Sequence, residues 1–276
     1  MKRMTAMNKV GMVLALFSMG TGLWAQSASI SPSRFYFKQA AGENGVQLLR
    51  VTNNGSRPET FQVTFANFAS EGNQGKTELV GADYPNGCAA WLSASPAFFE
   101  VAPGETRDVE IRMQVPAAPA GETVRWAVGQ VRLASERNAL NEQGNDVTGM
   151  QIIQTFQFLF HVFQTPPALA DAKEASVLSF SQVSAPGERP VTLMMEVENT
   201  GRAIADCVPY LDVLHQGSGE TRRELGKPFS VLPGGRRQVR LHLPEDLAPG
   251  AYNILGVIDY GSRNDLAGAE LNISID

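Results

Sequence analysis

The sequence has 276 residues, with 28 acidic and 23 basic side chains and a formal net charge of −5. No stretch combines a stripe of lysine or arginine with interleaved aromatic side chains, and the acidic balance disfavours a polyanionic partner, so nucleic-acid binding is excluded. Hydrolase elbows, phosphate loops and zinc-protease motifs do not occur, and histidine, cysteine and carboxylates do not cluster at metal-ligand spacing. The sequence therefore predicts neither an enzyme nor a metal or cofactor site.

The first residues have the pattern of a secretory signal peptide. Three basic side chains precede residue 10, and a short apolar run follows over Val10–Trp24. Ala25 supplies the small residue expected before the cut, although Leu23 is large for its position. We therefore expect residues 1–25 to be removed and the mature chain to be periplasmic. An uncleaved membrane anchor is the alternative for this segment, and no later stretch is suited to span a bilayer.

The rest of the first half reads as β-strands. Apolar and polar side chains alternate with the period of a strand, and Gly, Pro, Asn and Asp turns separate the runs. The expected strands are Ser29–Phe37, Gly45–Thr52, Glu59–Phe68, Ala97–Val101, Thr106–Val115, Val124–Leu133 and Gly149–Phe163. The polar segments Ala69–Ala90 and Ser135–Val147 are expected to be loops.

Thr165–Lys173 is expected to be a linker, because its two adjacent prolines stop strand pairing and stiffen the chain. We therefore place one domain at residues 26–166 and a second at residues 167–276. The expected strands of the second domain are Ser176–Val183, Val191–Glu198, Ala203–Leu214, Thr221–Val231, Arg236–Leu243, Ala251–Tyr260 and Ala267–Ile275.

The two halves share two short motifs. Val-Thr-Asn-Asn-Gly at residues 51–55 matches Val-Glu-Asn-Thr-Gly at residues 197–201, and the Pro-Gly turn at 103–104 matches the one at 233–234. About seven strands in each half, with turns roughly every ten residues, predict an all-β chain of two immunoglobulin-like β-sandwiches in tandem. Cys88 and Cys207 fall in different domains, so two separate thiols are favoured over a disulfide across the interface.

The segment of residues 150–167, MQIIQTFQFLFHVFQTPP, is the most informative. Side chains alternate between the faces of a strand, which places Phe156, Phe158, Phe160 and Val162 on one face and Ile153, Leu159 and Phe163 on the other. A strand that is apolar on both faces and has no partner would aggregate. The first face is expected to be core, and the second is then free to meet a partner chain.

The first half resembles the amino-terminal domain of periplasmic pilus assembly chaperones of the P-pilus type, a family of immunoglobulin-like sandwiches. The resemblance rests on an arginine before an apolar pair at residues 31–37, a Pro-Gly turn at 99–107, an aromatic-containing strand at 124–131 and a last strand that runs into a proline at 154–166. The order and spacing of these motifs are its basis. It covers most of the mature chain and is weaker in the second half, and the chain resembles a divergent member of the family.

The resemblance implies a mechanism of β-strand addition. Such chaperones lend the last strand of the first domain to an incomplete pilin sandwich, through main-chain hydrogen bonds and alternate side chains that fill a groove. The donor-strand candidates are Ile153, Phe156, Phe158, Leu159, Phe160 and Phe163. In the family, a cleft arginine and a lysine on the last strand hold the terminal carboxylate of the subunit. Arg34 matches the arginine, whose planar fork suits a carboxylate, but His161 stands nearest the position of the lysine and is only partly charged at neutral pH.

Two functions follow as hypotheses. The first is a pilus or fimbrial chaperone-like protein that binds secreted pilin-like or surface subunits. The second is an exported structural or adhesive module that binds protein or glycan through loops at a sandwich end. Trp91 and Trp126 are expected in the core, whereas an exposed, sugar-stacking tryptophan would favour the second function. The first requires an exposed edge at residues 150–163 and Arg34 in a cleft between two sandwiches that meet at an angle.

Overall fold

We analysed a computed structural model, which describes residues 28–72, 74–133, 157–185 and 187–275. Within these ranges the regular elements are β-strands and three short 3-10 turns, η1 (Ala89–Trp91), η2 (Ala120–Glu122) and η3 (Pro167–Leu169). No helix in the described part has the length and apolarity needed to cross a membrane. The expected signal peptide, the expected loop at residues 135–147 and two donor-strand candidates, Ile153 and Phe156, lie outside the described residues.

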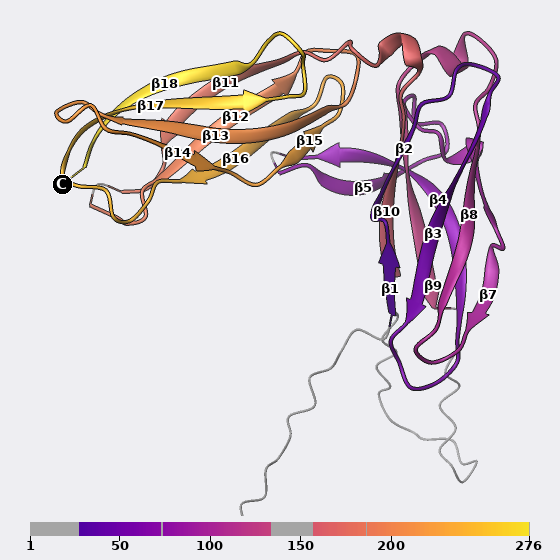
Figure 1. Ribbon diagram of the computed structural model, residues 1–276. Coiled ribbons are helices and arrows are strands. Elements are labelled where there is room, and N and C mark those ends of the chain that lie inside the picture. Colours follow the sequence, from indigo (N-terminus) through magenta and orange to yellow (C-terminus); the bar gives the residue numbers. More distant parts are fainter. Residues whose placement is uncertain (1–27, 73, 134–156, 186, 276) are drawn as a thin grey trace, which may run out of the picture.

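The first sandwich packs two sheets face to face (Figure 1). One sheet has the order β1-β3-β8-β6, and the other has the order β2-β10-β9-β4-β5 with β7 also paired to β4. The strands are β1 (Ala28–Ser31), β2 (Arg34–Phe37), β3 (Asn44–Asn53), β4 (Glu59–Glu71), β5 (Lys76–Val80), β6 (Leu92–Ser95), β7 (Phe98–Val101), β8 (Thr106–Gln114), β9 (Arg125–Leu133) and β10 (Gln157–Gln164). Alternate side chains of these strands, such as Phe35, Phe37, Leu49 and Ile111, fill the space between the sheets.

The second sandwich has the same plan. Its sheets have the orders β11-β12-β16 and β14-β13-β17-β18, and β15 also pairs with β13. The strands are β11 (Ala175–Gln182), β12 (Thr192–Asn199), β13 (Ala205–His215), β14 (Thr221–Leu225), β15 (Phe229–Val231), β16 (Arg236–His242), β17 (Gly250–Asp259) and β18 (Ala267–Ile275). Leu193, Met195, Leu211 and Ile254 are buried in its own core. The predicted fold, two immunoglobulin-like sandwiches in tandem, is confirmed.

Several predicted strands were wrong in extent. The strand predicted at Ser29–Phe37 is two strands, because Pro32 has no N–H to donate and the chain crosses there from one sheet to the other. The loop predicted at Ala69–Ala90 instead holds the end of β4 and its hairpin partner β5. The strand predicted at Thr221–Val231 is interrupted by Pro228 and forms β14 and β15. Strand β6 was not predicted at all.

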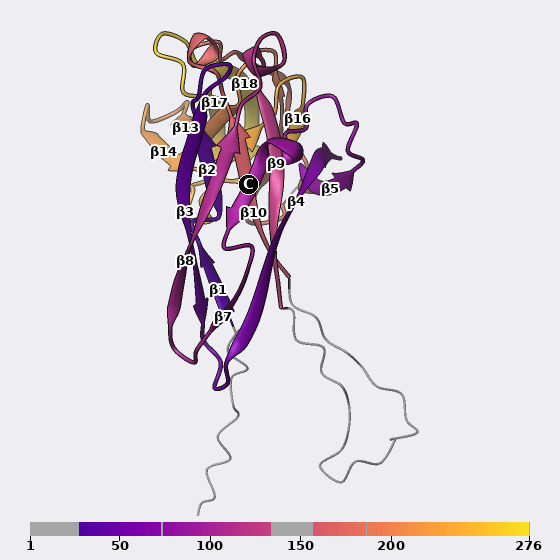
Figure 2. The same ribbon diagram turned by 90° about the vertical axis from the view of Figure 1, so that its right-hand side faces the viewer.

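A third apolar cluster joins the two sandwiches. Phe68, Trp126 and Phe163 of the first sandwich are buried against Ile204 and Leu232 of the second. The sandwiches meet at an angle, so the molecule is L-shaped with the bend beside η3 (Figure 1). In the view turned by 90°, the second sandwich lies behind the first (Figure 2). The predicted domain boundary at residues 166 and 167 falls between β10 and η3. Large apolar side chains from both sandwiches therefore fill the bend.

The repeated Asn-containing motif has a structural role in the first sandwich. Asn53 is fully buried, and its side-chain amide donates to the carbonyls of Arg57 at 2.7 Å and Val101 at 2.9 Å. Its side-chain oxygen accepts the N–H of Gly55 at 2.9 Å. Its own carbonyl accepts the N–H of Gly104, in the Pro-Gly turn, at 2.8 Å. One asparagine therefore ties together the two turns that the repeat contains.

The second sandwich repeats this arrangement with Asn199. The buried amide donates to the carbonyls of Ala203 at 2.9 Å and Val231 at 2.8 Å. Its side-chain oxygen accepts the N–H of Gly201 at 3.0 Å, and its carbonyl accepts the N–H of Gly234 at 3.0 Å. We name the two arrangements, centred on Asn53 and Asn199, the asparagine clasps.

The two cysteines form separate thiols. Cys88 and Cys207 are both buried and unbridged. Burial raises the pKa of each thiol to about 12, and the charges of Asp206 and Asp259 add to the effect at Cys207. Both side chains are therefore neutral near pH 7 and pack as small apolar groups.

Candidate functional site

Strand β10 divides its side chains between two environments. Phe158, Phe160 and Val162 face the core of the first sandwich. Phe160 is fully buried, with its ring centroid 5.2 Å from that of Phe35 and 6.1 Å from that of Phe65. The prediction that this face is core is therefore confirmed for the residues that the structure describes. These side chains are not available to a partner without opening the sandwich.

The opposite face of β10 runs from the interdomain joint towards solvent. Phe163 is buried in the joint, His161 comes next and is half-buried, and Leu159 is 40% exposed. These three side chains therefore form an apolar row that emerges from between the sandwiches. At the outer end of this row, Leu159 is open to a partner.

One backbone edge of β10 is also open. Strand β9 pairs with β10 along its whole described length. On the other side, the parallel strand β2 covers only His161–Gln164, starting with the pair His161 and Arg34. No strand among the described residues occupies that side of Gln157–Phe160. The reason is local: before Arg34 the chain has crossed to the opposite sheet as β1.

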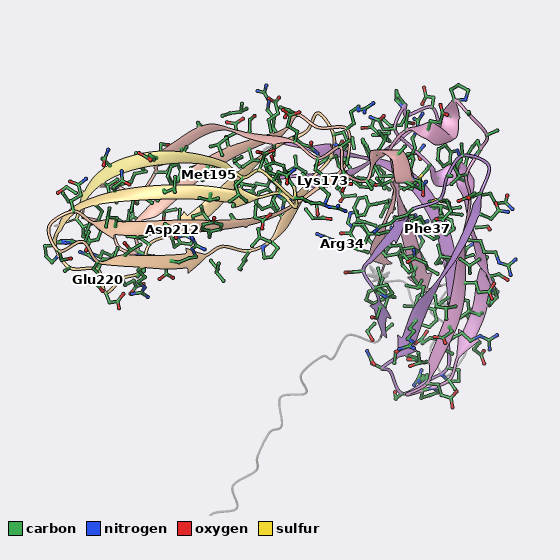
Figure 3. The ribbon with its side chains drawn as sticks, turned by 45° about the horizontal axis from the view of Figure 1, so that its top comes forward. Arg34, Phe37, Lys173, Met195, Asp212 and Glu220 are labelled. Carbon is green, nitrogen blue, oxygen red and sulfur yellow. The ribbon has the colours of Figure 1, made fainter. Side chains whose placement is uncertain are left out.

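Arg34 stands where this open edge ends, and it faces the second sandwich. Its Nη1 donates to Oγ of Ser230, on β15, at 3.1 Å. That hydroxyl in turn donates to Oδ1 of Asp206, on β13, at 2.6 Å. Figure 3 shows Arg34 between the two sandwiches. Arg34 forms no ion pair with a carboxylate among the described residues, so its charge has no direct anionic partner there.

His161 lies beside Arg34 but in an apolar environment. Its Nε2 is 2.9 Å from Oγ1 of Thr77, on β5, and its ring is 5.1 Å from that of Phe68 and 6.0 Å from that of Phe163. Burial lowers the pKa of His161, and the positive charge of Arg34 lowers it further. The imidazole is therefore neutral at pH 7. Its predicted role as a carboxylate anchor stays a prediction, and a hydrogen bond is the only contribution that the neutral ring could make.

This lowered pKa predicts a pH effect on stability. The ordinary pKa of 6.5 applies to the unfolded chain, so as pH falls below about 6.5 the unfolded state takes up a proton that the folded state resists. The free energy of unfolding, measured with urea at pH 7.5 and at pH 5, should therefore fall less in a His161→Gln protein than in the wild type. His242→Gln, at an exposed position, is the control, and an equal fall in all three proteins would contradict the assignment.

A cavity of about 440 Å³ continues the cleft on the other side of β2. It is lined by Tyr36, Lys38, Thr165, Ala170 and Lys173 together with Ala203, Ile204 and Asp206 of the second sandwich. Burial and the charge of Asp206 raise the pKa of Tyr36, whose ring lies 5.3 Å from that of Phe163. The cleft is thus apolar at its base and mainly basic at its rim.

Comparison with known proteins describes the fold. No protein-family model and no curated sequence matches the chain. Solved structures that resemble it include the class 5 fimbriae chaperone CfaA, at 10% identity and a TM-score of 0.45 over 90% of this chain and 99% of that chain. The fold is similar to that of fimbrial chaperones. The chaperone CupB2 of Pseudomonas aeruginosa has 13% identity and a TM-score of 0.43 over 90% of this chain and 100% of its own. The chaperone DraB of E. coli has 13% identity and a TM-score of 0.42 over 89% and 98%. These similarities describe the fold alone, because the sequence identities and the TM-scores are low. The function is inferred from the geometry of the site.

Arg237 is a cleft residue that the sequence did not single out. It lies on β16, half-buried, and its Nη1 donates to the carbonyl of Ser230 at 3.3 Å while its guanidinium lies 5.5 Å above the ring of Phe229. Burial lowers its pKa, and the charge of Arg34 adds to the effect. The only sequence signal for Arg237 was its place after the second Pro-Gly turn. That position does not indicate that Arg237 lies near Arg34, which is far away in the sequence.

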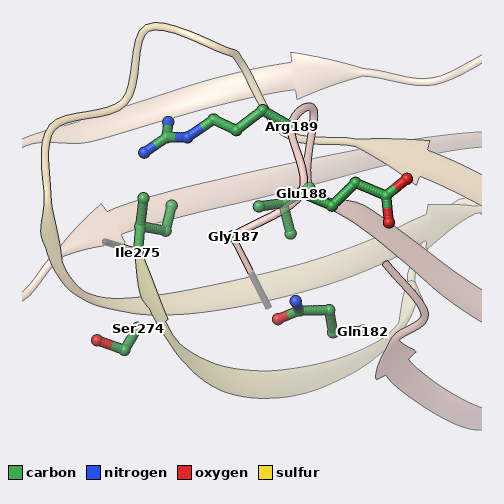
Figure 4. Close-up of a pocket in the computed structure, with 7 residues that line it drawn as sticks. Gln182, Gly187, Glu188, Arg189, Ser274 and Ile275 are labelled. Atoms are coloured by element: carbon green, nitrogen blue, oxygen red, sulfur yellow. The ribbon is translucent and has the colours of Figure 1, made fainter. Parts of the chain in front are cut away.

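The remaining features do not form a site. A second cavity of about 160 Å³ lies at the other end of the second sandwich, lined by Gln182, Glu188, Arg189 and Ser274 among others (Figure 4). There Arg189 donates to the carbonyls of Glu245 and Leu247, so it fastens a loop. No group of three or more histidine, cysteine or carboxylate side chains in the described part is placed to hold a metal ion.

Proposed function

We propose that the protein is a periplasmic chaperone that binds exported, pilin-like subunits by pairing strand β10 with a strand of the subunit. It acts by binding and carries out no reaction. The periplasmic location is inferred from the basic and apolar pattern of residues 1–25. Arg34 receives the terminal carboxylate of the subunit.

The observation on which this proposal rests is the open edge of β10 that ends at Arg34. On the side that faces away from β9, the backbone of Gln157–Phe160 has no strand partner in the described part, and Leu159 offers an apolar side chain beside this edge. Main-chain pairing of this kind supplies affinity, and alternate side chains supply specificity. At the end of the edge, a guanidinium without a carboxylate partner suits a chain terminus.

The direction of the bound strand follows from the same geometry. Strand β10 runs towards the cleft, and β2 is parallel to it from Arg34 onwards. A strand whose carboxyl end reaches Arg34 must therefore run parallel to β10. It would occupy the same position in the sheet as β2 and end where β2 begins. The bound strand would fill the open edge of β10 without displacing any described strand.

The alternative, a module that binds through loops at a sandwich end, has no specific observation in its favour. Trp126 is buried in the interdomain joint, where its indole N–H donates to the carbonyl of Phe68 at 2.9 Å. Trp91 packs against the core, with the guanidinium of Arg125 5.9 Å from its ring centroid. Trp126 therefore has no face open to a sugar, and Trp91 is partly covered by the core and by Arg125.

A synthetic strand peptide tests the proposal. The probe is a peptide of about ten residues, alternating valine and threonine, with a free terminal carboxylate, and the comparison peptide carries a terminal amide. The free acid should bind about 10- to 100-fold more tightly, because a charge-assisted hydrogen bond contributes about 1.5–3 kcal/mol. Arg34→Gln should remove this difference. Binding is measured by fluorescence anisotropy at low salt.

Two further results decide between strand addition and adsorption. N-methylation of alternate peptide nitrogens on the pairing edge should abolish binding, whereas methylation on the other edge should be tolerated. The proposal would be contradicted if both methylated peptides bound equally well, or if the wild type bound the free-acid and amide peptides equally well. Arg50→Gln is the matched control, because Arg50 lies on β3 and pairs with Asp108 at 3.5 Å in the other sheet.

A further inference from the structure

The carboxylate end of the site has one cation from the first sandwich, Arg34, and no lysine on β10. His161, which stands beside Arg34, is held neutral by its surroundings. Arg34 is also linked to the carboxylate of Asp206 through the Ser230 hydroxyl, so a bound carboxylate would bring a second negative charge into the half-buried cleft. A second cation from another element would balance that charge.

We propose that Arg237 of the second sandwich supplies this second cation, so that a bound carboxylate is held by one arginine from each domain. This inference rests on the proposed function and adds a residue to its site. Arg237 is the residue that the geometry assigns, because it and Arg34 converge on a single residue. Arg34 donates to Oγ of Ser230 at 3.1 Å, and Arg237 donates to the carbonyl oxygen of Ser230 at 3.3 Å.

The two guanidiniums are close enough to repel each other and are not neutralised. Neither forms an ion pair with a carboxylate among the described residues. Asp206, which lines the cleft, accepts hydrogen bonds from Ser230 at 2.6 Å and from Tyr36 at 3.4 Å. The Ser230 hydroxyl thus stands between Asp206 and Arg34. Two like charges gathered in a partly buried cleft are unfavourable, and an incoming anion would relieve the repulsion.

The hairpin of β4 and β5 explains why Arg237 is held in this position. A side chain at Gly75, in the tip of the hairpin, would lie 2.9 Å from Nη1 of Arg237, so the backbone of the tip approaches the guanidinium closely. The hairpin also places Thr77 on His161 at 2.9 Å. Figure 1 shows the hairpin reaching from the first sandwich to the second. Hairpin, Phe229 ring and Ser230 carbonyl together limit the positions that Arg237 can take.

The test uses the free-acid and amide peptides with Arg237→Gln. Binding of the free acid should weaken about 10-fold, and binding of the amide should stay unchanged. Arg237→Lys should restore part of the preference for the acid, because it keeps the charge but not the fork. Arg240→Gln removes the same charge from an exposed position on the opposite face of β16 and should have no effect.

The outcomes separate this inference from the proposed function. If the wild type prefers the acid, Arg34→Gln removes the preference and Arg237→Gln does not alter it, Arg237 is not the second cation and strand addition stands. If Arg237→Gln weakens acid and amide alike, with an unchanged melting temperature, Arg237 acts by packing and the inference fails. If the wild type shows no preference for the acid, the proposed function and the inference fail together.

Discussion

A Leu159→Glu protein should melt like the wild type and bind the strand peptide at least about 100-fold more weakly. The side chain is 40% exposed on the outer face of β10, so a carboxylate there remains hydrated and the free energy of unfolding changes by no more than about 0.5 kcal/mol. A paired strand would cover this position. The substitution then removes the apolar contact and forces a charge out of water, which costs about 3 kcal/mol of binding.

Substitutions on the other face of β10 should give the opposite result. Phe160→Glu places a charge among Phe35, Phe65 and the backbone of Gly129. The Phe160 ring lies so close to Gly129 that a side chain at position 129 would collide with it. It should unfold the first sandwich, and Phe158→Glu should destabilise it, both visible in thermal melting. A Leu159→Glu protein that melts normally and still binds the peptide would falsify strand donation from this face.

Replacing the central asparagine of either clasp with alanine should lower the free energy of unfolding by about 3–5 kcal/mol and the melting temperature by about 10–20 °C. In Asn199→Ala, the carbonyls of Ala203 and Val231 and the N–H of Gly201 lose their partner inside the protein. Asn53→Ala should have the same effect on the first sandwich. Each unsatisfied buried group costs about 1–3 kcal/mol, and the losses accumulate at one site.

The controls for the clasps are the residues that follow them. Asn54→Ala and Thr200→Ala change exposed side chains in the same turns and should shift the melting temperature by only a few degrees. Hydrogen exchange read by mass spectrometry shows which sandwich has lost protection. If the Ala variants at the clasps and at the control positions melt alike, the clasps have no special role in stability.

The strands that the sequence predicted correctly are those with a clean period of two, such as β8, β12 and β18. The errors arose where pairing overrides local pattern. Strand β5, with the polar sequence Lys-Thr-Glu-Leu-Val, is a strand because β4 extends beyond the sandwich and gives it a partner. The break at Pro32 could be expected from its missing N–H, but the switch of sheets depends on where β3 and β10 lie.

The site, too, could be predicted only where it depends on the local pattern of a single segment. Arg34 and the two faces of β10 are each a local feature of their own segment, and the alternation of apolar residues was enough to distinguish the buried Phe160 from the exposed Leu159. Arg237 belongs to the site only because β15 and β16 fold back against the first sandwich. No pattern within one segment contains that contact. It is a tertiary property, and so is the burial that keeps His161 neutral.

The division of β10 into two faces has a consequence for how such a protein can change over generations. Under the proposed function, the residues that hold the sandwich together and the residue that meets the subunit alternate along one short segment. A substitution at Leu159 alters recognition and leaves folding intact, whereas one at Phe160 removes both. Recognition can therefore diversify one position at a time against a constant scaffold, without a compensating change elsewhere in the molecule.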